Sequence, residues 1–202
     1  YLSGSALVYV TVEYGGAGGY YAVSARDISL YFDHCTVRRN SGGGIQVGGT
    51  GGRVSSSTVA ENGAHGIYFN VDSDSGAAVW VEDSTVEYND SSGIYVYSDY
   101  GSASAYVLRN AVDHNGQTGI YVAISGSLVE DNLVEQNGQS SYMSGGGVRV
   151  DRDNCTVRGN RVLANRGDPG AGIYASGWGT LVTQNTIADN ESSSSGGGIY
   201  AE

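Results

Sequence analysis

The chain repeats itself about every 25 residues, and this period constrains its fold more than any other property. A β-branched anchor residue recurs in motifs such as TVRRN, TVAEN, TVEYN and AVDHN. The eight anchors are Val12, Val37, Val59, Val86, Val112, Val134, Val162 and Ile187. The first and last lie seven repeats apart, so the mean period is 25 residues and the individual spacings run from 22 to 28. A fixed period of about 20 to 50 residues is typical of solenoids, in which each repeat is one structural unit.

Asparagine occupies the position three residues after the anchor in seven successive repeats. These residues are Asn40, Asn62, Asn89, Asn115, Asn137, Asn165 and Asn190. An amide side chain both donates and accepts hydrogen bonds, so identical amides in stacked repeats can form a continuous ladder. We expect the column at a turn, with the asparagine itself in the left-handed backbone conformation that this residue tolerates.

Short apolar segments flank this turn in every repeat. An apolar residue lies five positions before each anchor, as in Phe32 and Val54, and a G-I-x-V segment or a close variant follows each asparagine. The alternation of apolar and polar residues predicts β-strands that bury one face. One repeat cannot bury that face alone, whereas repeats stacked at ~4.8 Å enclose a continuous core. We therefore predict an all-β, single-stranded parallel β-helix of about eight coils of 22 to 28 residues, with residues 1–202 as one domain.

A second column, two residues before the anchor, holds small or polar side chains and predicts a second inward ladder. It reads Val10, Cys35, Ser57, Ser84, Asn110, Asn132, Asn160 and Asn185. Cys155 belongs to a different column, five coils away from Cys35, which is roughly 24 Å at ~4.8 Å per coil. That separation is far beyond disulfide reach, so we predict two free, buried thiols.

The charge balance excludes two classes of partner. The formal net charge is −11, and all ten cationic residues are arginine. Nucleic acids require a basic face for phosphate contacts, so we expect no nucleic-acid partner. No stretch is long and apolar enough to span a bilayer, so we also expect no membrane insertion.

The segments TVRRNSGGGIQV, TVAENGAHGIYF, TVEYNDSSGIYV and AVDHNGQTGIYV resemble the right-handed parallel β-helix repeat family, within the pectate-lyase-like solenoid superfamily. The resemblance covers essentially the whole chain and implies a right-handed helix and an extracellular or cell-surface location. Such repeats occur in polysaccharide lyases, hydrolases, epimerases, adhesins and surface repeat proteins, so the fold alone does not select a function. The chain begins and ends inside a coil, which favours a segment of a longer chain or a self-stacking unit.

Tyrosine recurs at the outward position of the G-I-x-V segments. The residues are Tyr68, Tyr95, Tyr121, Tyr174 and Tyr200, and Gln46 and Arg149 interrupt the row. Stacked tyrosines predict a flat aromatic strip suited to sugar rings, and hence a candidate glycan-binding surface. The alternative is structural, because tyrosine has a high strand propensity and pairs well across strands.

Three carboxylates follow the anchors of consecutive repeats, at Glu87, Asp113 and Glu135. Carboxylates spaced at ~4.8 Å repel one another unless a cation or a proton intervenes. Calcium takes oxygen ligands of this type, so the three residues are a candidate calcium site. Arg109 lies close in sequence, and the resemblance to calcium-dependent polysaccharide lyases makes Arg109, Asp113 and Glu135 candidate catalytic residues. The alternative is a solvated acidic face in which Arg109 pairs with Asp83 and Asp131.

Two functions follow from these observations. The favoured one is a non-catalytic structural or adhesive module of a secreted or cell-surface protein, which requires no cofactor, assembles end to end and binds glycans. Its partners are then polysaccharides or further copies of itself. The alternative is a polysaccharide-active enzyme, either a lyase or a glycoside hydrolase. The polygalacturonase-type patterns NTD, DD and GHG are absent, and the lack of lysine removes the R-x-K pattern of many pectate lyases.

Overall fold

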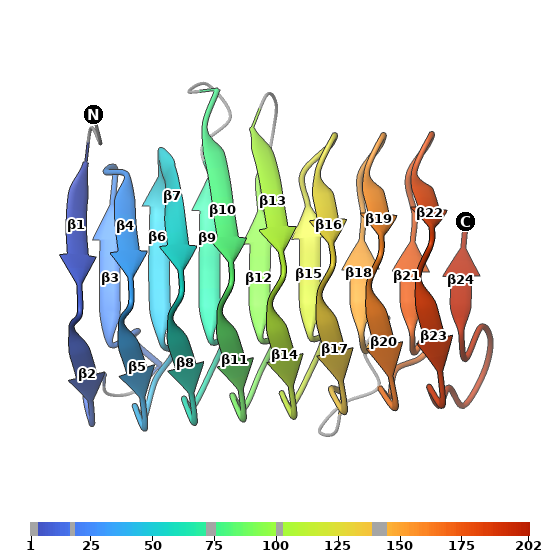
Figure 1. The fold of residues 1–202 in the computed structure, drawn as a ribbon, viewed down its shortest axis with the longest axis horizontal. Coiled ribbons are helices and arrows are strands. Elements are labelled where there is room, and N and C mark those ends of the chain that lie inside the picture. The colour runs from blue at the N-terminus through green and yellow to red at the C-terminus, as the bar shows by residue number, and fades with distance from the viewer. Residues whose placement is uncertain (1–3, 17–18, 72–75, 100–102, 139–144) are drawn as a thin grey trace.

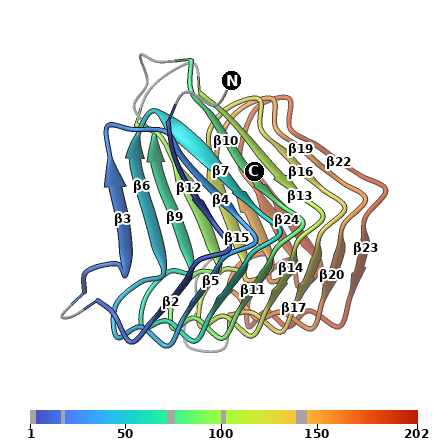
Figure 2. The same cartoon turned by 60° about the vertical axis from the view of Figure 1, so that its left-hand side comes forward.

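The computed structural model is an all-β solenoid, in which the backbone winds through stacked coils along one axis (Figure 1). The structure describes residues 4–16, 19–71, 76–99, 103–138 and 145–202. Each coil contributes one strand to each of three sheets, which gives the cross-section three sides (Figure 2). Among the residues that are described, no helix has the length and apolar character needed to span a bilayer.

In the part of the chain that the structure describes, each sheet contains eight parallel strands, one from each coil. Sheet A contains β1 (Ser5–Val8), β4 (Leu30–Asp33), β7 (Gly51–Ser55), β10 (Ala78–Glu82), β13 (Ser104–Leu108), β16 (Leu128–Glu130), β19 (Thr156–Arg158) and β22 (Leu181–Thr183). Sheet B contains β2 (Thr11–Glu13), β5 (Thr36–Arg38), β8 (Thr58–Ala60), β11 (Thr85–Glu87), β14 (Ala111–Asp113), β17 (Leu133–Glu135), β20 (Arg161–Leu163) and β23 (Thr186–Ala188). Sheet C contains β3 (Val23–Arg26), β6 (Ile45–Gly49), β9 (Ile67–Val71), β12 (Ile94–Tyr97), β15 (Ile120–Ala123), β18 (Val148–Val150), β21 (Ile173–Ala175) and β24 (Ile199–Ala201).

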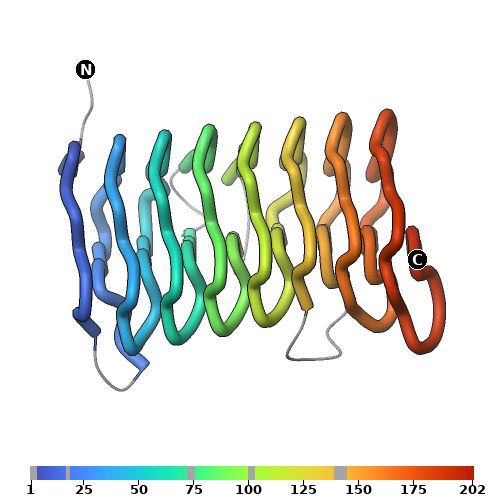
Figure 3. The backbone as a smooth tube through the Cα atoms, turned by 60° about the horizontal axis from the view of Figure 1, so that its bottom comes forward, coloured from blue at the N-terminus to red at the C-terminus, as the bar shows by residue number. Residues whose placement is uncertain are grey.

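The predicted columns are confirmed as registers between neighbouring coils. In sheet B, Val86 pairs with Val59 on one side and with Val112 on the other, and the anchors continue in this way from end to end. The tube in Figure 3 shows the coils stacked one behind another. Inward Val and Ile side chains of the central coils, such as Ile94, are fully buried. The core is therefore one continuous apolar column enclosed by three sheets.

The asparagine ladder is confirmed along its whole predicted length. Each amide nitrogen donates to the amide oxygen of the next coil, from Asn40 to Asn62 at 2.7 Å through to Asn165 and Asn190 at 3.0 Å. Each amide oxygen also accepts from the backbone N–H of the preceding ladder residue, as Asn137 does from Asn115 at 3.0 Å. The buried turn between sheets B and C thus has its polar groups satisfied along the stack.

The left-handed residue at this turn differs from the expectation. Positive φ angles occur at the residue before each asparagine, and the ladder residues themselves have none. The residues concerned are Arg39, Glu61, Tyr88, His114, Gln136, Ala164 and Asp189, with φ between 49° and 57°. Their left-handed backbone turns the corner, and the asparagine that follows directs its side chain inward to bond along the stack. The prediction that the asparagine itself is left-handed was wrong.

The second ladder and both thiols lie where the columns predicted. Asn110 donates to Asn132 at 3.0 Å, and the chain of amides continues through Asn160 to Asn185. Cys35 and Cys155 are free and buried, as expected. Burial raises the pKa of the Cys155 thiol, which keeps it in its neutral, unreactive form.

Candidate functional site

The predicted tyrosines form a row on the outer face of sheet C. In the strand register Tyr68 pairs with Tyr95, Tyr95 with Tyr121, and Tyr174 with Tyr200, with Arg149 between the two groups. We call these six residues the tyrosine row. They alternate along their strands with inward residues that are buried in every coil but the last, where Ile199 is 47% exposed. The period of two therefore places every ring on the outer face.

The tyrosine rings of the row stack on one another, with their planes roughly perpendicular to the axis of the solenoid. The ring centroids are 5.4 Å apart between Tyr68 and Tyr95 and 4.4 Å apart between Tyr95 and Tyr121, with planes inclined by 26° and 27°. Tyr174 and Tyr200 are 5.6 Å apart at 13°. Such near-parallel rings are too close to lie side by side in one plane, so they stack face to face with an offset. The surface therefore presents ring edges and hydroxyl groups, and the flat strip of ring faces that we expected is not formed.

Arg149 continues the row, whereas the sequence analysis treated it as an interruption. Its guanidinium carbon lies 5.3 Å from the ring centroid of Tyr121 and 4.9 Å from that of Tyr174, so it joins the two groups of rings by cation–π contacts. Asp151 holds the guanidinium with both carboxylate oxygens, at 2.9 and 2.8 Å from Nε. The charge of Arg149 is therefore neutralised where it meets the rings.

Two further aromatic residues join the row, and the sequence analysis assigned neither to it. Tyr21 stacks on Tyr68 with centroids 5.8 Å apart. Its ring occupies the space above Gly43, where an added Cβ would lie 2.3 Å from the ring. His65 packs against Tyr68 at 5.7 Å and Tyr95 at 4.8 Å. Both residues come from irregular connections outside the strands, so the strand columns carried no signal for them.

Burial shifts the pKa of several aromatic side chains on this face towards their neutral forms. Burial is the main cause that raises the pKa of Tyr21, Tyr68 and Tyr121, so their hydroxyls stay protonated. Burial likewise lowers the pKa of His65 to about 4. The neutral imidazole accepts a hydrogen bond at Nδ1 from the backbone N–H of Ser92, at 3.2 Å. This bond assigns the proton to Nε2, which makes that nitrogen a donor.

The three carboxylates Glu87, Asp113 and Glu135 also lie in register, on neighbouring strands of sheet B. The pKa of Glu87 is raised, first by burial and then by the charges of Asp113 and Glu61, and His114 opposes the shift. The neighbouring carboxylates therefore disfavour the charged form of Glu87. Within the described ranges, no group of three or more His, Cys, Asp or Glu side chains has an arrangement that would hold a metal ion.

Asp113 also meets the histidine that follows it. Its Oδ1 and the Nδ1 of His114 are 3.6 Å apart, and both are buried atoms without a hydrogen-bond partner. The other side of His114 is the ring of Tyr88, stacked at 4.7 Å. The rings of Tyr88 and His114 therefore lie beside the carboxylate of Asp113, at the corner between sheets B and C.

Arg109 is directed away from the other two candidate catalytic residues. Its Nε and one Nη donate to the two oxygens of Asp83, each at 2.8 Å, and the same Nη donates to Glu82 at 2.9 Å. Pairing with Asp83 is confirmed, but the second partner is Glu82 and not the expected Asp131. Both partners belong to the preceding coil, in and just after β10, whereas Asp113 lies on β14 beside Glu87 and Glu135.

Three parallel sheets wound from successive coils, with two internal amide ladders, define a parallel β-helix solenoid. A family model described as the right-handed beta helix region matches residues 44–202, so the chain belongs to that family. A search of curated proteins matches F-box only protein 10 of Homo sapiens, at 37% identity over 91 residues. That match spans 43% of this chain and 8% of the human protein.

Two solved structures are similar to this chain. The A-module of the mannuronan C-5 epimerase AlgE4 of Azotobacter vinelandii aligns with 93% of this chain and 57% of its own, with a TM-score of 0.53 and 14% identity. The Dettilon tailspike protein gp208 aligns with 98% of this chain and 60% of its own, with a TM-score of 0.44 and 13% identity. The chain thus spans less than two thirds of each matched protein. At 14% identity the likeness to the epimerase module establishes the β-helix fold and nothing about activity.

Proposed function

We propose that the chain is a rigid, non-catalytic module of a secreted or cell-surface protein that binds an extended, neutral glycan along the tyrosine row. The observation that carries this proposal is the stack of Tyr68, Tyr95 and Tyr121, which Arg149 continues to Tyr174 and Tyr200. Tyr174 is buried, and the hydroxyls of Tyr174 and Tyr200 donate to Glu202, so the first three coils of the row supply the ring edges and hydroxyls that a ligand can reach. Five coil steps of ~4.8 Å give the row a length of roughly 24 Å. A glycan laid along the axis then meets about one ring for each sugar unit.

Hydrogen bonding is the recognition that this face supports. Each phenol hydroxyl is both a donor and an acceptor, and a sugar ring carries hydroxyls with the same two capacities. The ring edges between the hydroxyls give apolar contact to the C–H groups of the sugar. Arg149 is held by Asp151 and His65 is neutral, so the donors of the row are fixed in place before a ligand arrives.

A neutral glycan fits the charges better than a uronate polymer does. The one arginine in the row is neutralised by Asp151, and the whole chain carries −11. An anionic polymer would therefore approach a surface of its own sign. The fold shared with a mannuronan C-5 epimerase is compatible with a polysaccharide ligand. The negative net charge of the chain favours a neutral polysaccharide over an anionic one.

The amide ladders supply the rigidity that such a surface requires. They fix the spacing of the coils, and with it the spacing of the rings in sheet C. A preformed row loses little conformational entropy on binding, which favours weak but regular contacts repeated along a chain.

A glycan array with the intact chain tests the proposal. We expect binding to extended neutral glycans and a clear loss with Tyr95→Ala and Tyr121→Ala. The matched control is Tyr88→Asn, which removes an exposed tyrosine at the corner after β11 and keeps a residue that tolerates the left-handed backbone there. Binding that survives both alanine substitutions in folded protein contradicts the proposal.

One observation favours the alternative of a polysaccharide-active enzyme. Glu87 has a raised pKa beside Asp113. The two residues are register partners on neighbouring strands, and the strand spacing of ~4.8 Å is near the separation of about 5–5.5 Å between the carboxyl groups of retaining glycosidases. Turnover of a polysaccharide that is abolished by Asp113→Asn supports this alternative. Turnover unchanged by both Arg109→Ala and Asp113→Ala removes these residues from any catalytic role.

A further inference from the structure

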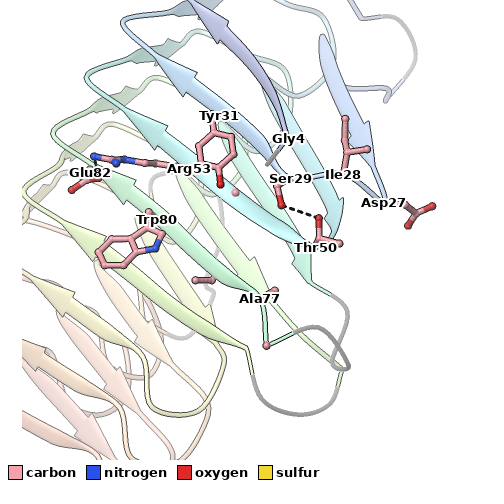
Figure 4. Close-up of a pocket in the computed structure, with 13 residues that line it drawn as sticks. Gly4, Asp27, Ile28, Ser29, Tyr31, Thr50, Arg53, Ala77, Trp80 and Glu82 are labelled. Carbon is pink, nitrogen blue, oxygen red and sulfur yellow. Dashed lines mark hydrogen bonds and ion pairs between the residues drawn. The ribbon is translucent and has the colours of Figure 1, made fainter. Parts of the chain in front are cut away.

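A hollow of about 830 Å³ lies on the outer face of sheet A, on a different side of the solenoid from the tyrosine row (Figure 4). Tyr31, Arg53 and Trp80 line it from the neighbouring strands β4, β7 and β10, where they occupy one register. Its volume is within the range of about 300–1,000 Å³ that is usual for small-molecule sites. We propose that this hollow binds a single neutral sugar ring, independently of the glycan surface on sheet C.

Small residues on β7 and β10 open the hollow. Gly51 has φ +84°, and a Cβ there would lie 2.5 Å from the carbonyl oxygen of Ala78, so glycine is required. Gly52 occupies a column whose members in the neighbouring coils, Leu30 and Val79, are buried in the core. The backbone of Gly52 and the small side chain of Ala78 line the floor of the hollow, and the aromatic residues further along the strands form its wall.

Trp80 offers one free ring face to this space. Its other face is stacked on Tyr106 of β13, with centroids 4.0 Å apart and planes inclined by 14°. Tyr106 does not line the hollow, whereas Trp80 does, so the open side of the indole is directed towards β7 and β4. An indole face held rigidly from behind is a suitable surface for the C–H face of a sugar ring.

An ion pair with Glu82 directs the side chain of Arg53 away from the space between Tyr31 and Trp80. Its guanidinium lies 2.6 Å from an oxygen of Glu82, whose side chain is 9% exposed, and Figure 4 shows the two side chains meeting at one end of the hollow. The second oxygen of Glu82 binds Arg109, which also pairs with Asp83. Two cations thus face two anions, so this end of the hollow has no net charge to attract an ionic ligand.

The opposite end combines an apolar and a polar group. Ile28 is 41% exposed at the lip, and the hydroxyls of Ser29 and Thr50 lie 3.1 Å apart beside it. One of these hydroxyls donates to the other, and the pair keeps free capacity for a ligand hydroxyl. Asp27 also lines this end, and its carboxylate can accept a hydrogen bond from a sugar hydroxyl but repels an anion. Apolar faces with such a rim match a sugar ring better than a phosphate or a carboxylate.

Tryptophan fluorescence tests this inference directly, because the chain has only two tryptophans. Trp178 is 89% exposed, and Trp178→Phe leaves Trp80 as the sole indole. Glucose, galactose, mannose and N-acetylglucosamine are titrated through the millimolar range. We expect a saturable change in Trp80 emission with at least one of them.

Matched substitutions locate the response. Ala78→Leu fills the hollow without touching the aromatic residues, and we expect it to weaken binding at least about tenfold. Ser104→Leu makes the same change at the register partner of Ala78 on β13, outside the hollow, and leaves binding unchanged. No response to any of the four sugars, or a response that Ala78→Leu preserves, overturns the inference. Tyr95→Ala does not alter this titration, so the sites on sheets A and C are tested separately.

Discussion

The side-chain nitrogen of Asn115 lies 2.9 Å from the side-chain oxygen of Asn137, one coil further along, and both residues are fully buried. Asn115 also donates to the backbone oxygens of Val86 and Asp113, and its own oxygen accepts from Asn89. Asn115→Ala leaves these buried groups unpaired, and each costs about 1–3 kcal/mol. We therefore expect Asn115→Ala to lower the free energy of unfolding by about 3 kcal/mol or more.

Chemical denaturation measures this loss. Gln117→Ala is the control, because it truncates an amide on the surface of the same coil, and we expect it to cost no more than about 0.5 kcal/mol. Equal losses for the two variants would show that the ladder is not what holds the coils together.

His65 makes stability depend on pH. Its pKa is about 4 in the folded chain, below the ordinary value of 6.5, because burial disfavours the cation. Between these values the unfolded chain binds more protons, so the contribution of neutral His65 is present above pH 6.5 and is lost as the pH falls towards 4. The full effect is at most about 3 kcal/mol.

The free energy of unfolding measured across this pH range tests that assignment. We expect His65→Phe to flatten the dependence between pH 6.5 and 4. An NMR titration of the native chain in which His65 takes up its proton near pH 6.5 would contradict the buried, neutral imidazole.

Arg149 and Asp151 are coupled, since the side chain of Asp151 is 13% exposed and its main charged partner is Arg149. Arg149→Tyr extends the aromatic row but leaves Asp151 without its cation, with a hydrogen bond from Ser176 remaining, and we expect it to cost about 2 kcal/mol. Adding Asp151→Ser places a serine at this position, as in the next coil, where Ser176 is the equivalent residue. We expect the double variant to regain most of the loss in a thermal unfolding experiment. Strictly additive effects would mean that the two side chains do not depend on each other.

Glu87 is expected to destabilise the folded chain at neutral pH. Its pKa is raised, so its favourable contribution is present at low pH and is lost as the pH rises through the raised value. Glu87→Gln should therefore increase stability at pH 7 by less than about 1 kcal/mol, with no gain at pH 3. A loss of stability at pH 7 would show that the ionised carboxylate is needed.

The calcium proposal for Glu87, Asp113 and Glu135 is tested on the same variants. If calcium binds between these carboxylates, it raises the Tm of the native chain and has a smaller effect on Asp113→Asn, because a ligand that binds only the folded state stabilises it. A Tm that calcium leaves unchanged contradicts a site in this column.

The repeating part of the fold was predictable because stacking imposes identical demands on every coil. An amide ladder requires the same residue at each level, so Asn115 and its equivalents form a visible column. The anchors, such as Val86, recur for the same reason, because the core has a constant width. These two columns were enough to predict a parallel β-helix, its registers and the free cysteines.

The candidate site was less predictable, because its residues depend on local geometry. Left-handed corners accept Arg39, Tyr88 and Ala164 alike, so no residue type marks them. The tyrosine column was visible in sequence, but the tilt of its rings depends on contacts between neighbouring coils. Tyr21 and His65 reach the row from irregular segments, and no periodic pattern records such segments.

The orientation of the tyrosine rings is the central claim about function, and removal of their hydroxyls tests it most directly. Isothermal titration of the best glycan from the array is compared between the native chain and the double variant Tyr95→Phe with Tyr121→Phe. These substitutions retain the stacked rings and remove only the outward hydroxyls. Tyr106→Phe is the control, because it makes the same change on sheet A. We predict that the double variant binds at least about tenfold more weakly while the control is unaffected. Unchanged affinity of the folded double variant would contradict recognition through the hydroxyl edges of the row.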